Sequence, residues 1–263
     1  MDIITTAVYV GIALAIVMFL FNIFHYIIAA IFGVRIEIFC MSYPLVTLYM
    51  FQFYRNETSY RLGWIPLGGF VKHSGVIAEG LDESKVIPSH MLLSKTPLVK
   101  FICISGTPIL LLIPFVISAF FIDTNNSITV GFQVVYDVFH NLYEYLFTLI
   151  DSDQATANWY TITQKHTMFP IVFCFISLLT AITSTLSSFK YLLQQGESML
   201  DKVFEIIQGI LLLYFAYKGI ALYFSVDGFM DGLWNLFKFT IAVYIISFVL
   251  MLLIKLLPKN KYI

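Results

Sequence analysis

The chain has 263 residues, of which 59% are hydrophobic and 12% are charged. Because a soluble globular domain carries about 25% charged residues, this composition excludes a soluble fold and predicts a polytopic membrane protein. The formal net charge of −1 argues against a nucleic-acid-binding protein, for which a basic patch is the expected footprint.

Long stretches without Lys, Arg, Asp or Glu mark the expected membrane spans. The first stretch begins close to Met1 without a basic region or a cleavage site, so we interpret it as a retained helix rather than a signal peptide. Each stretch is long enough to cross a hydrocarbon core, which takes about 20 helical residues. The five predicted transmembrane helices lie near residues 4–31, 98–122, 168–189, 203–224 and 235–257.

The charges between these spans predict their orientation. The loop after the first span is rich in Lys and Arg, whereas the loop after the second is dominated by Asp and Glu. We expect the chain to lie in a bacterial inner membrane. Because basic residues favour the cytoplasmic side, its N-terminus should be outside and its C-terminus in the cytoplasm. The loop charges alternate in sign as five spans require.

Residues 34–73, between the first two helices, show a different pattern. Polar and apolar residues alternate over 35–39, which is typical of a β-strand. The runs 45–54 and 60–72 are rich in β-branched and aromatic residues, and Asn56 to Thr58 form a polar turn between them. We therefore predict a small membrane-associated antiparallel β-sheet in an otherwise all-α fold.

The segment 128–150, between the second and third spans, has apolar residues at helical spacing from Val130 to Leu149. This pattern predicts an amphipathic helix. Since the helix has no basic face that would attract anionic lipid, packing against protein is its expected use.

Several short motifs identify a family resemblance. Gly33-Val34-Arg35 follows the first helix, Thr58 lies between, and the run 65–72 reads Ile-Pro-Leu-Gly-Gly-Phe-Val-Lys. Over residues 5–225 the chain resembles the site-2 proteases, the M50 metallopeptidase family, in the branch of the regulator of sigma-E protease. The motif positions that carry this resemblance are Gly33, Pro66, Gly68, Gly69, Lys72, Gly106 and Pro108.

The resemblance also implies a division of the chain. Residues 1–225 correspond to the family's membrane core, which holds the first four spans, the β region and the amphipathic helix. Residues 226–263 add a further transmembrane helix and a basic tail.

The catalytic residues that the family implies are missing. Its members carry His-Glu-x-x-His on the first helix, where two imidazoles bind zinc and the Glu acts as general base. This chain has Phe21, Asn22 and His25 at those three positions. Alignment of the third helix places Ser184 and Leu192 where the family has an Asn and the ligand Asp. Because a catalytic zinc needs three protein ligands, we expect a pseudoprotease without a metal or other cofactor.

Asn22 and His25 lie one helical turn apart within an apolar run. Polar residues inside a membrane usually face the bundle interior and find partners there. We therefore predict a closed, dry polar seam between the first and third helices, formed by Asn22, His25, Thr180, Thr183, Ser184 and Ser187.

The loop histidines raise the alternative of a rebuilt metal site. His73 and His90 share a loop with Glu79, Asp82 and Glu83, so these side chains could meet around a metal ion. A histidine exposed on the surface is the commoner case, and it is our expectation for both.

We consider three functions, of which the sequence features favour the first. The second loop is too short for the family's PDZ domains, which act as a substrate filter. The chain lacks the catalytic residues and the substrate filter and has gained a helix. These differences indicate an inactive accessory subunit of a larger membrane complex. Such a subunit contacts lipids and other integral membrane subunits. The alternatives are a pseudoprotease that binds single-span clients and regulates their cleavage or trafficking, and an active zinc protease with a divergent site. We expect no nucleic-acid partner.

Overall fold

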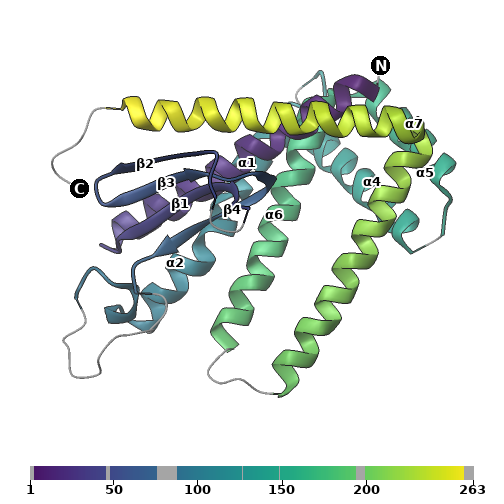
Figure 1. Cartoon of the computed structure of the whole chain (residues 1–263). Helices are drawn as coiled ribbons and strands as arrows, with labels where there is room; N and C mark the ends of the chain where they lie inside the picture. Colours follow the sequence, from purple (N-terminus) through teal and green to yellow (C-terminus); the bar gives the residue numbers. More distant parts are fainter. Residues whose placement is uncertain are drawn as a thin grey trace.

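The computed structural model describes residues 3–257 apart from 46–47, 76–87, 126, 148 and 194–198. Side chains are described within these ranges except at 3–6, 67, 186–193 and most of 199–229. Most of the chain is helical, and one small sheet lies beside the N-terminal helix (Figure 1). The elements are α1 (Ile3–Ile31), β1 (Ile36–Tyr43), β2 (Phe51–Arg55), β3 (Thr58–Leu62), β4 (Ile65–His73), η1 (Leu92–Ser94), α2 (Pro97–Leu110), α3 (Leu112–Phe120), α4 (Ile128–Leu146), α5 (Ser152–Lys165), α6 (Met168–Leu193) and α7 (Met199–Leu256).

Helix α1 follows the uninterrupted apolar run and ends as the sequence predicts. Gly33 adopts a φ of 60°, a left-handed conformation that glycine takes without steric cost. The Val34 N–H donates to the Ala29 carbonyl, so the chain leaves the helix through a glycine cap and enters the sheet at once.

The second predicted span is broken into α2 and α3. Helix α2 begins with a well-formed cap, because the Thr96 side chain accepts a hydrogen bond from the Val99 N–H and Pro97 occupies the first turn. The helix ends at Leu110, four residues before Pro114. A proline lacks the N–H that would bond four residues back, so Pro114 explains why one continuous helix does not form.

The sheet has the strand order β2-β3-β1-β4. Pairs β2–β3 and β1–β4 are antiparallel as predicted, but β1 and β3 run parallel, so the expectation of a wholly antiparallel sheet is wrong. Strand β2 reverses the chain at the edge, and the turn at Asn56 and Glu57 reverses it again. Strand β3 therefore inserts beside β1 in the same direction as β1.

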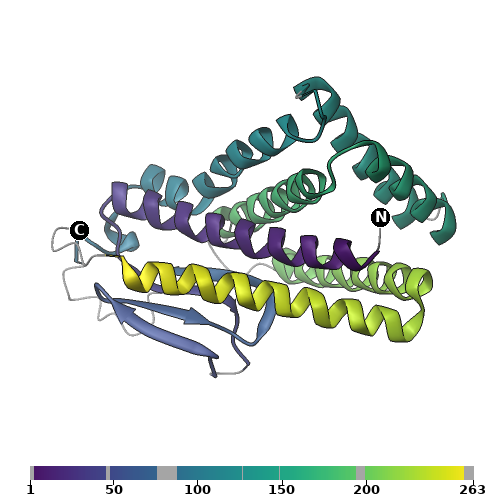
Figure 2. The same cartoon turned by 90° about the horizontal axis from the view of Figure 1, so that it is seen from above.

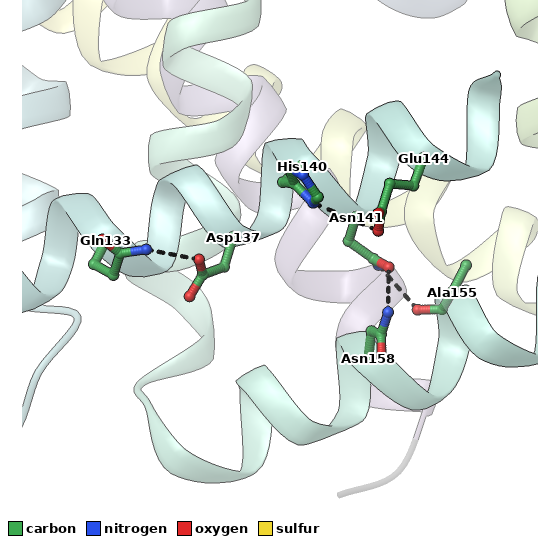
Figure 3. A network of polar contacts seen from close by, with 7 residues as sticks. All are labelled: Gln133, Asp137, His140, Asn141, Glu144, Ala155 and Asn158. Atoms are coloured by element: carbon green, nitrogen blue, oxygen red, sulfur yellow. Dashed lines mark hydrogen bonds and ion pairs between the residues drawn. The ribbon is translucent and has the colours of Figure 1, made fainter. Parts of the chain in front are cut away.

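The predicted amphipathic segment forms α4, and a second helix, α5, follows it. The Asp151 side chain caps α5 by accepting a hydrogen bond from the Gln154 N–H. The two helices are joined by Asn141, which donates to the Ala155 carbonyl and accepts from the Asn158 amide (Figure 3). Packing against protein, as the sequence predicted, is thus part of what α4 does.

The remaining polar groups of α4 in Figure 3 pair along the helix itself. Gln133 donates to Asp137 at 2.8 Å, and His140 lies 3.5 Å from Glu144. Both pairs have the one-turn spacing that allows side chains to meet on a helix surface.

Helix α7 replaces two predicted helices. It runs for 58 residues without interruption, so the expected boundary between residues 225 and 226 falls inside it. Figure 1 shows that α7 bends sharply into two arms, of which the second passes beside α1 and the sheet. The second arm corresponds to the fifth predicted span.

Four helices are long and apolar enough to cross a membrane in the part of the chain that was searched. They are Ala7–Ile31, Pro97–Phe120, Met168–Thr185 and Met230–Leu256. The predicted span 203–224 falls on the first arm of α7, where most side chains lie outside the described residues.

Helix α1 and the second arm of α7 lie side by side and run in the same direction (Figure 2). Small residues, namely Ala7, Gly11 and Ala15, recur every four positions on the buried face of α1. A Cβ at Gly11 would lie 2.7 Å from the Phe239 carbonyl oxygen and 3.0 Å from the Ala242 Cβ. The two backbones therefore approach closely by the small-residue packing that is common between membrane helices.

Candidate functional site

The middle of α1 meets the sheet through Asn22. This side chain is wholly buried, and its Nδ2 donates a hydrogen bond to the Cys40 carbonyl on β1 at 3.1 Å. Since a backbone carbonyl in an apolar interior needs a donor, this bond ties the strand to the helix at the point where they cross.

The glycines of the run 65–72 make this approach possible. A side chain at Gly69 would collide with the Cys40 carbonyl and would crowd the Asn22 amide at 3.3 Å. Gly68 has a φ of 84°, and a Cβ there would meet the Tyr43 ring at 2.8 Å. The two glycines therefore let β4 lie close to β1 and leave room for Asn22.

Other motif residues link the strands around the point where α1 crosses β1. Buried Thr58 donates from Oγ1 to the Ile36 carbonyl at 2.8 Å, which links β3 to the start of β1. Lys72 forms an ion pair of 3.1 Å with Glu37 across β1 and β4. These contacts join the strands of the sheet to one another.

The remaining motif residues occupy the proline-bearing strand and the second helix. Pro66 lies near the start of β4, and Pro108 lies inside α2, where it is buried. A Cβ at Gly106 would lie 3.1 Å from Ile28 Cδ1, so α2 passes close to the end of α1 at this point.

His25 lies one turn beyond Asn22. Its Nδ1 donates to the Phe21 carbonyl at 3.2 Å, and its ring packs edge-on against the Phe21 ring with 4.5 Å between the ring centres. Because a carbonyl can only accept, Nδ1 carries the proton and Nε2 carries the free lone pair.

His73, at the end of β4, faces His25 with 5.8 Å between the ring centres. Only 5% of His73 is exposed, so our expectation of a surface histidine is wrong. Its Nε2 is buried without a hydrogen-bond partner among the described residues. Burial lowers the pKa of His73 to about 4, so the imidazole is neutral at pH 7.

Sequence reasoning missed this histidine pair. It placed His73 in a group with His90, Glu79, Asp82 and Glu83, and these three acidic residues lie outside the described part of the chain. The available signal was that His73 lies two residues after the apolar Val71, because alternate residues of a strand point to the same face.

The sequence predicts that Asn22 and His25 have partners on α6, and this polar seam stays a prediction. The bonds recorded for Asn22 and His25 run to β1 and within α1, because β1 brings a backbone carbonyl to this face of α1. On α6, Thr183 donates to the Leu179 carbonyl at 2.9 Å and is exposed, and Thr180 and Ser184 are half-buried. The side chains of Ser187 and Leu192 lie outside the described residues.

The family's catalytic zinc does not fit the side chains on α1. Such an ion needs three protein ligands and a nearby carboxylate that takes a proton from water. His25 could be one ligand, but Phe21 has no ligand atom, and Asn22 has a neutral amide in place of the carboxylate base. The Asn22 Nδ2 is bonded to the Cys40 carbonyl, and its Oδ1 has no hydrogen-bond partner among the described residues. Within the described ranges, no three side chains of His, Cys, Asp or Glu come together in a way that could hold a metal ion.

Comparisons with known proteins agree with the fold and motifs. The model of peptidase family M50 matches residues 9–258. A protein of Helicobacter pylori strain J99, whose name places it among the zinc metalloproteases, is 37% identical over 73 residues. That match covers 28% of this chain and 20% of the relative, so the chain spans only about a fifth of the relative's length.

Replacing Asn22 with Leu tests the bond between helix and sheet. The Asn22→Leu variant leaves the buried Cys40 carbonyl without its side-chain donor, which costs about 1–3 kcal/mol. We therefore expect a lower midpoint of thermal unfolding in detergent. Asn125→Leu, in the exposed turn after α3, is the matched control and should unfold like the unchanged protein. Equal midpoints for both variants would contradict the role of Asn22.

Proposed function

The chain belongs to peptidase family M50, and we propose that it is a catalytically inactive member that serves as an accessory subunit of a larger membrane protein complex. The observation that carries the proposal is the state of the catalytic face of α1. Phe21 and Asn22 occupy the positions of a zinc ligand and the general base, and the Asn22 amide is bonded to the Cys40 carbonyl.

An amide in this position has different chemistry from a glutamate. A general base must accept a proton from water, whereas the Asn22 Nδ2 donates a hydrogen bond. A glutamate carboxylate could not donate to the Cys40 carbonyl and would carry a charge in an apolar site, which is costly unless it is paired. The exchange of Glu for Asn thus supports a structural role for this face.

The region between α3 and α6 supports the loss of a substrate filter. Helices α4 and α5 occupy most of it, and α4 packs on α6 through Phe139 and Phe175, whose ring centres lie 4.8 Å apart. These helices belong to the membrane core and take up the length of chain in which a separate domain would have to fold.

The surface of α7 supports contacts with other membrane components. Its second arm exposes large apolar side chains, among them Leu233, Trp234, Phe237, Ile241, Ile245 and Leu253. Lipid covers such a surface in a single chain, and a neighbouring transmembrane subunit covers it in a complex.

The proposed topology has five crossings, with the N-terminus outside and the C-terminus in the cytoplasm. A helix of 58 residues is about 87 Å long, far more than the roughly 30 Å hydrocarbon core, so the two arms of α7 provide two crossings. The start of α1 and the end of α7 lie at opposite ends of the molecule (Figure 2), in keeping with an odd number of crossings.

Purification from native membranes tests the role as a subunit. We expect a tagged chain in mild detergent to carry the same membrane partners at a fixed stoichiometry in independent preparations. A chain that purifies alone would contradict the proposal. Varying, substoichiometric amounts of single-span proteins would favour the client-binding alternative instead.

Elemental analysis of the purified protein tests inactivity. Because His25 is the one ligand left from the catalytic set, we expect far less than one zinc ion per chain. One zinc ion per chain that is lost in the His25→Ala variant, but kept in a His140→Ala variant on the exposed face of α4, would favour an active protease with a divergent site.

Labelling of single introduced cysteines tests the topology. The native cysteines are buried, so Ser89→Cys before α2 and Asn125→Cys after α3 supply exposed thiols on the two sides of one crossing. In intact cells we expect a membrane-impermeant maleimide to label the Asn125→Cys variant and to spare the Ser89→Cys variant until the cells are opened. The reverse result would invert the orientation.

A further inference from the structure

The facing imidazoles of His25 and His73 form a buried pair with no assigned role. They come from different elements, α1 and the end of β4, and are 9% and 5% exposed. His25 lies about 9 Å from the end of α1 by helical rise, so the pair is close to one membrane surface. Two histidines in an apolar interior are costly unless their ring nitrogens find partners.

The free nitrogens of the pair are prepared as ligands. His25 donates from Nδ1 to the Phe21 carbonyl, so its Nε2 holds a lone pair, and the Nε2 of His73 has no hydrogen-bond partner among the described residues. Most metal-binding histidines donate the N–H of their other ring nitrogen to a carboxylate, a backbone carbonyl or water, and this bond fixes the orientation of the ring.

The spacing of the rings fits one ion between them. No direct hydrogen bond joins the two side chains, and their ring centres are 5.8 Å apart. With metal–nitrogen bonds of about 2.0–2.1 Å, two imidazoles that share one ion have ring centres about 5–6 Å apart. The gap is therefore too wide for a hydrogen bond and suitable for a bridging ion.

The neighbouring groups select the kind of ion. In the described part of the chain no Asp, Glu, Cys or third His completes a group of three with this pair. Neutral ligands in an apolar site favour the lowest ionic charge, since burial of charge is costly. Imidazole is also a ligand that suits copper. We infer that His25 and His73 form a two-imidazole site for monovalent copper that links α1 to the end of β4.

Copper titration under reducing conditions tests this site. Purified protein in detergent with ascorbate should take up one Cu(I) per chain in competition with bicinchoninate, and X-ray absorption should show two nitrogen neighbours. His25→Gln and His73→Gln should each abolish this binding. The control His140→Gln, on exposed α4, should keep it.

Two results would overturn the inference. One is binding in the His73→Gln variant equal to that of the unchanged protein, with both proteins folded as judged by thermal unfolding. The other is uptake of zinc, added alone, with the same stoichiometry and the same dependence on His73. Neither result decides whether the chain is a subunit, because that proposal rests on Phe21 and Asn22.

Discussion

The hydrogen bond from the Asn22 amide to the Cys40 carbonyl joins the middle of a membrane-spanning helix to a strand of the sheet. A strand that packs against an apolar helix must satisfy its backbone groups within the protein, because the helix face and lipid offer few partners. Strand β1 meets this requirement from three sides, with β3 and β4 as neighbours and α1 beneath it. Gly69 provides the space for this arrangement, so the glycine motif and Asn22 depend on each other.

The second arm of α7 packs against both elements that the bond between Asn22 and Cys40 joins. Phe39 and Met41 of β1 are buried in one cluster with Met251 and Ile254 of α7. Further along, Gly11 lets the same arm approach α1 closely. The last helix thus packs on both the strand and the helix that Asn22 joins, and it becomes part of the core rather than an appendage.

In our proposal, the same face of α1 carries the difference from an active protease. In the family this face holds zinc ligands and a base, whereas here it holds an amide that donates to a strand, a phenyl ring and one histidine. The His25–His73 pair shows that such a face can still keep nitrogen ligands and acquire a new partner from the sheet.

Much of the fold could be predicted from the sequence, for definite reasons. Charge-free runs indicated the helices, and alternation over residues 35–39 indicated β1. Alternation does not reveal which strands pair, so the parallel β1–β3 pair was missed. Helix α5 was missed because its sequence is polar and has no apolar period of its own. The spans near 203–224 and 235–257 were expected as separate helices, but α7 continues through Gly232 between them, as helices tolerate isolated glycines.

The residue types at the site could be predicted from the sequence, but the residues that they contact could not. The proposed loss of the zinc ligand and base rests on Phe21 and Asn22, which can be read in the sequence directly. The partner of Asn22 depends on a strand that crosses the helix. The burial of His73 depends on where β4 ends. Neither is a local property of the chain. Reasoning from one helix therefore chose α6 as the partner, because α6 carries the visible run of Thr and Ser.

A structure of the protein in lipid nanodiscs by electron cryomicroscopy tests the central claim most directly. Our account predicts that the Asn22 amide lies within hydrogen-bond distance of the Cys40 carbonyl, with His25 against His73 and no open path for water between α1 and α6. A water-filled cleft between these helices, with Asn22 turned into it and away from β1, would contradict the account.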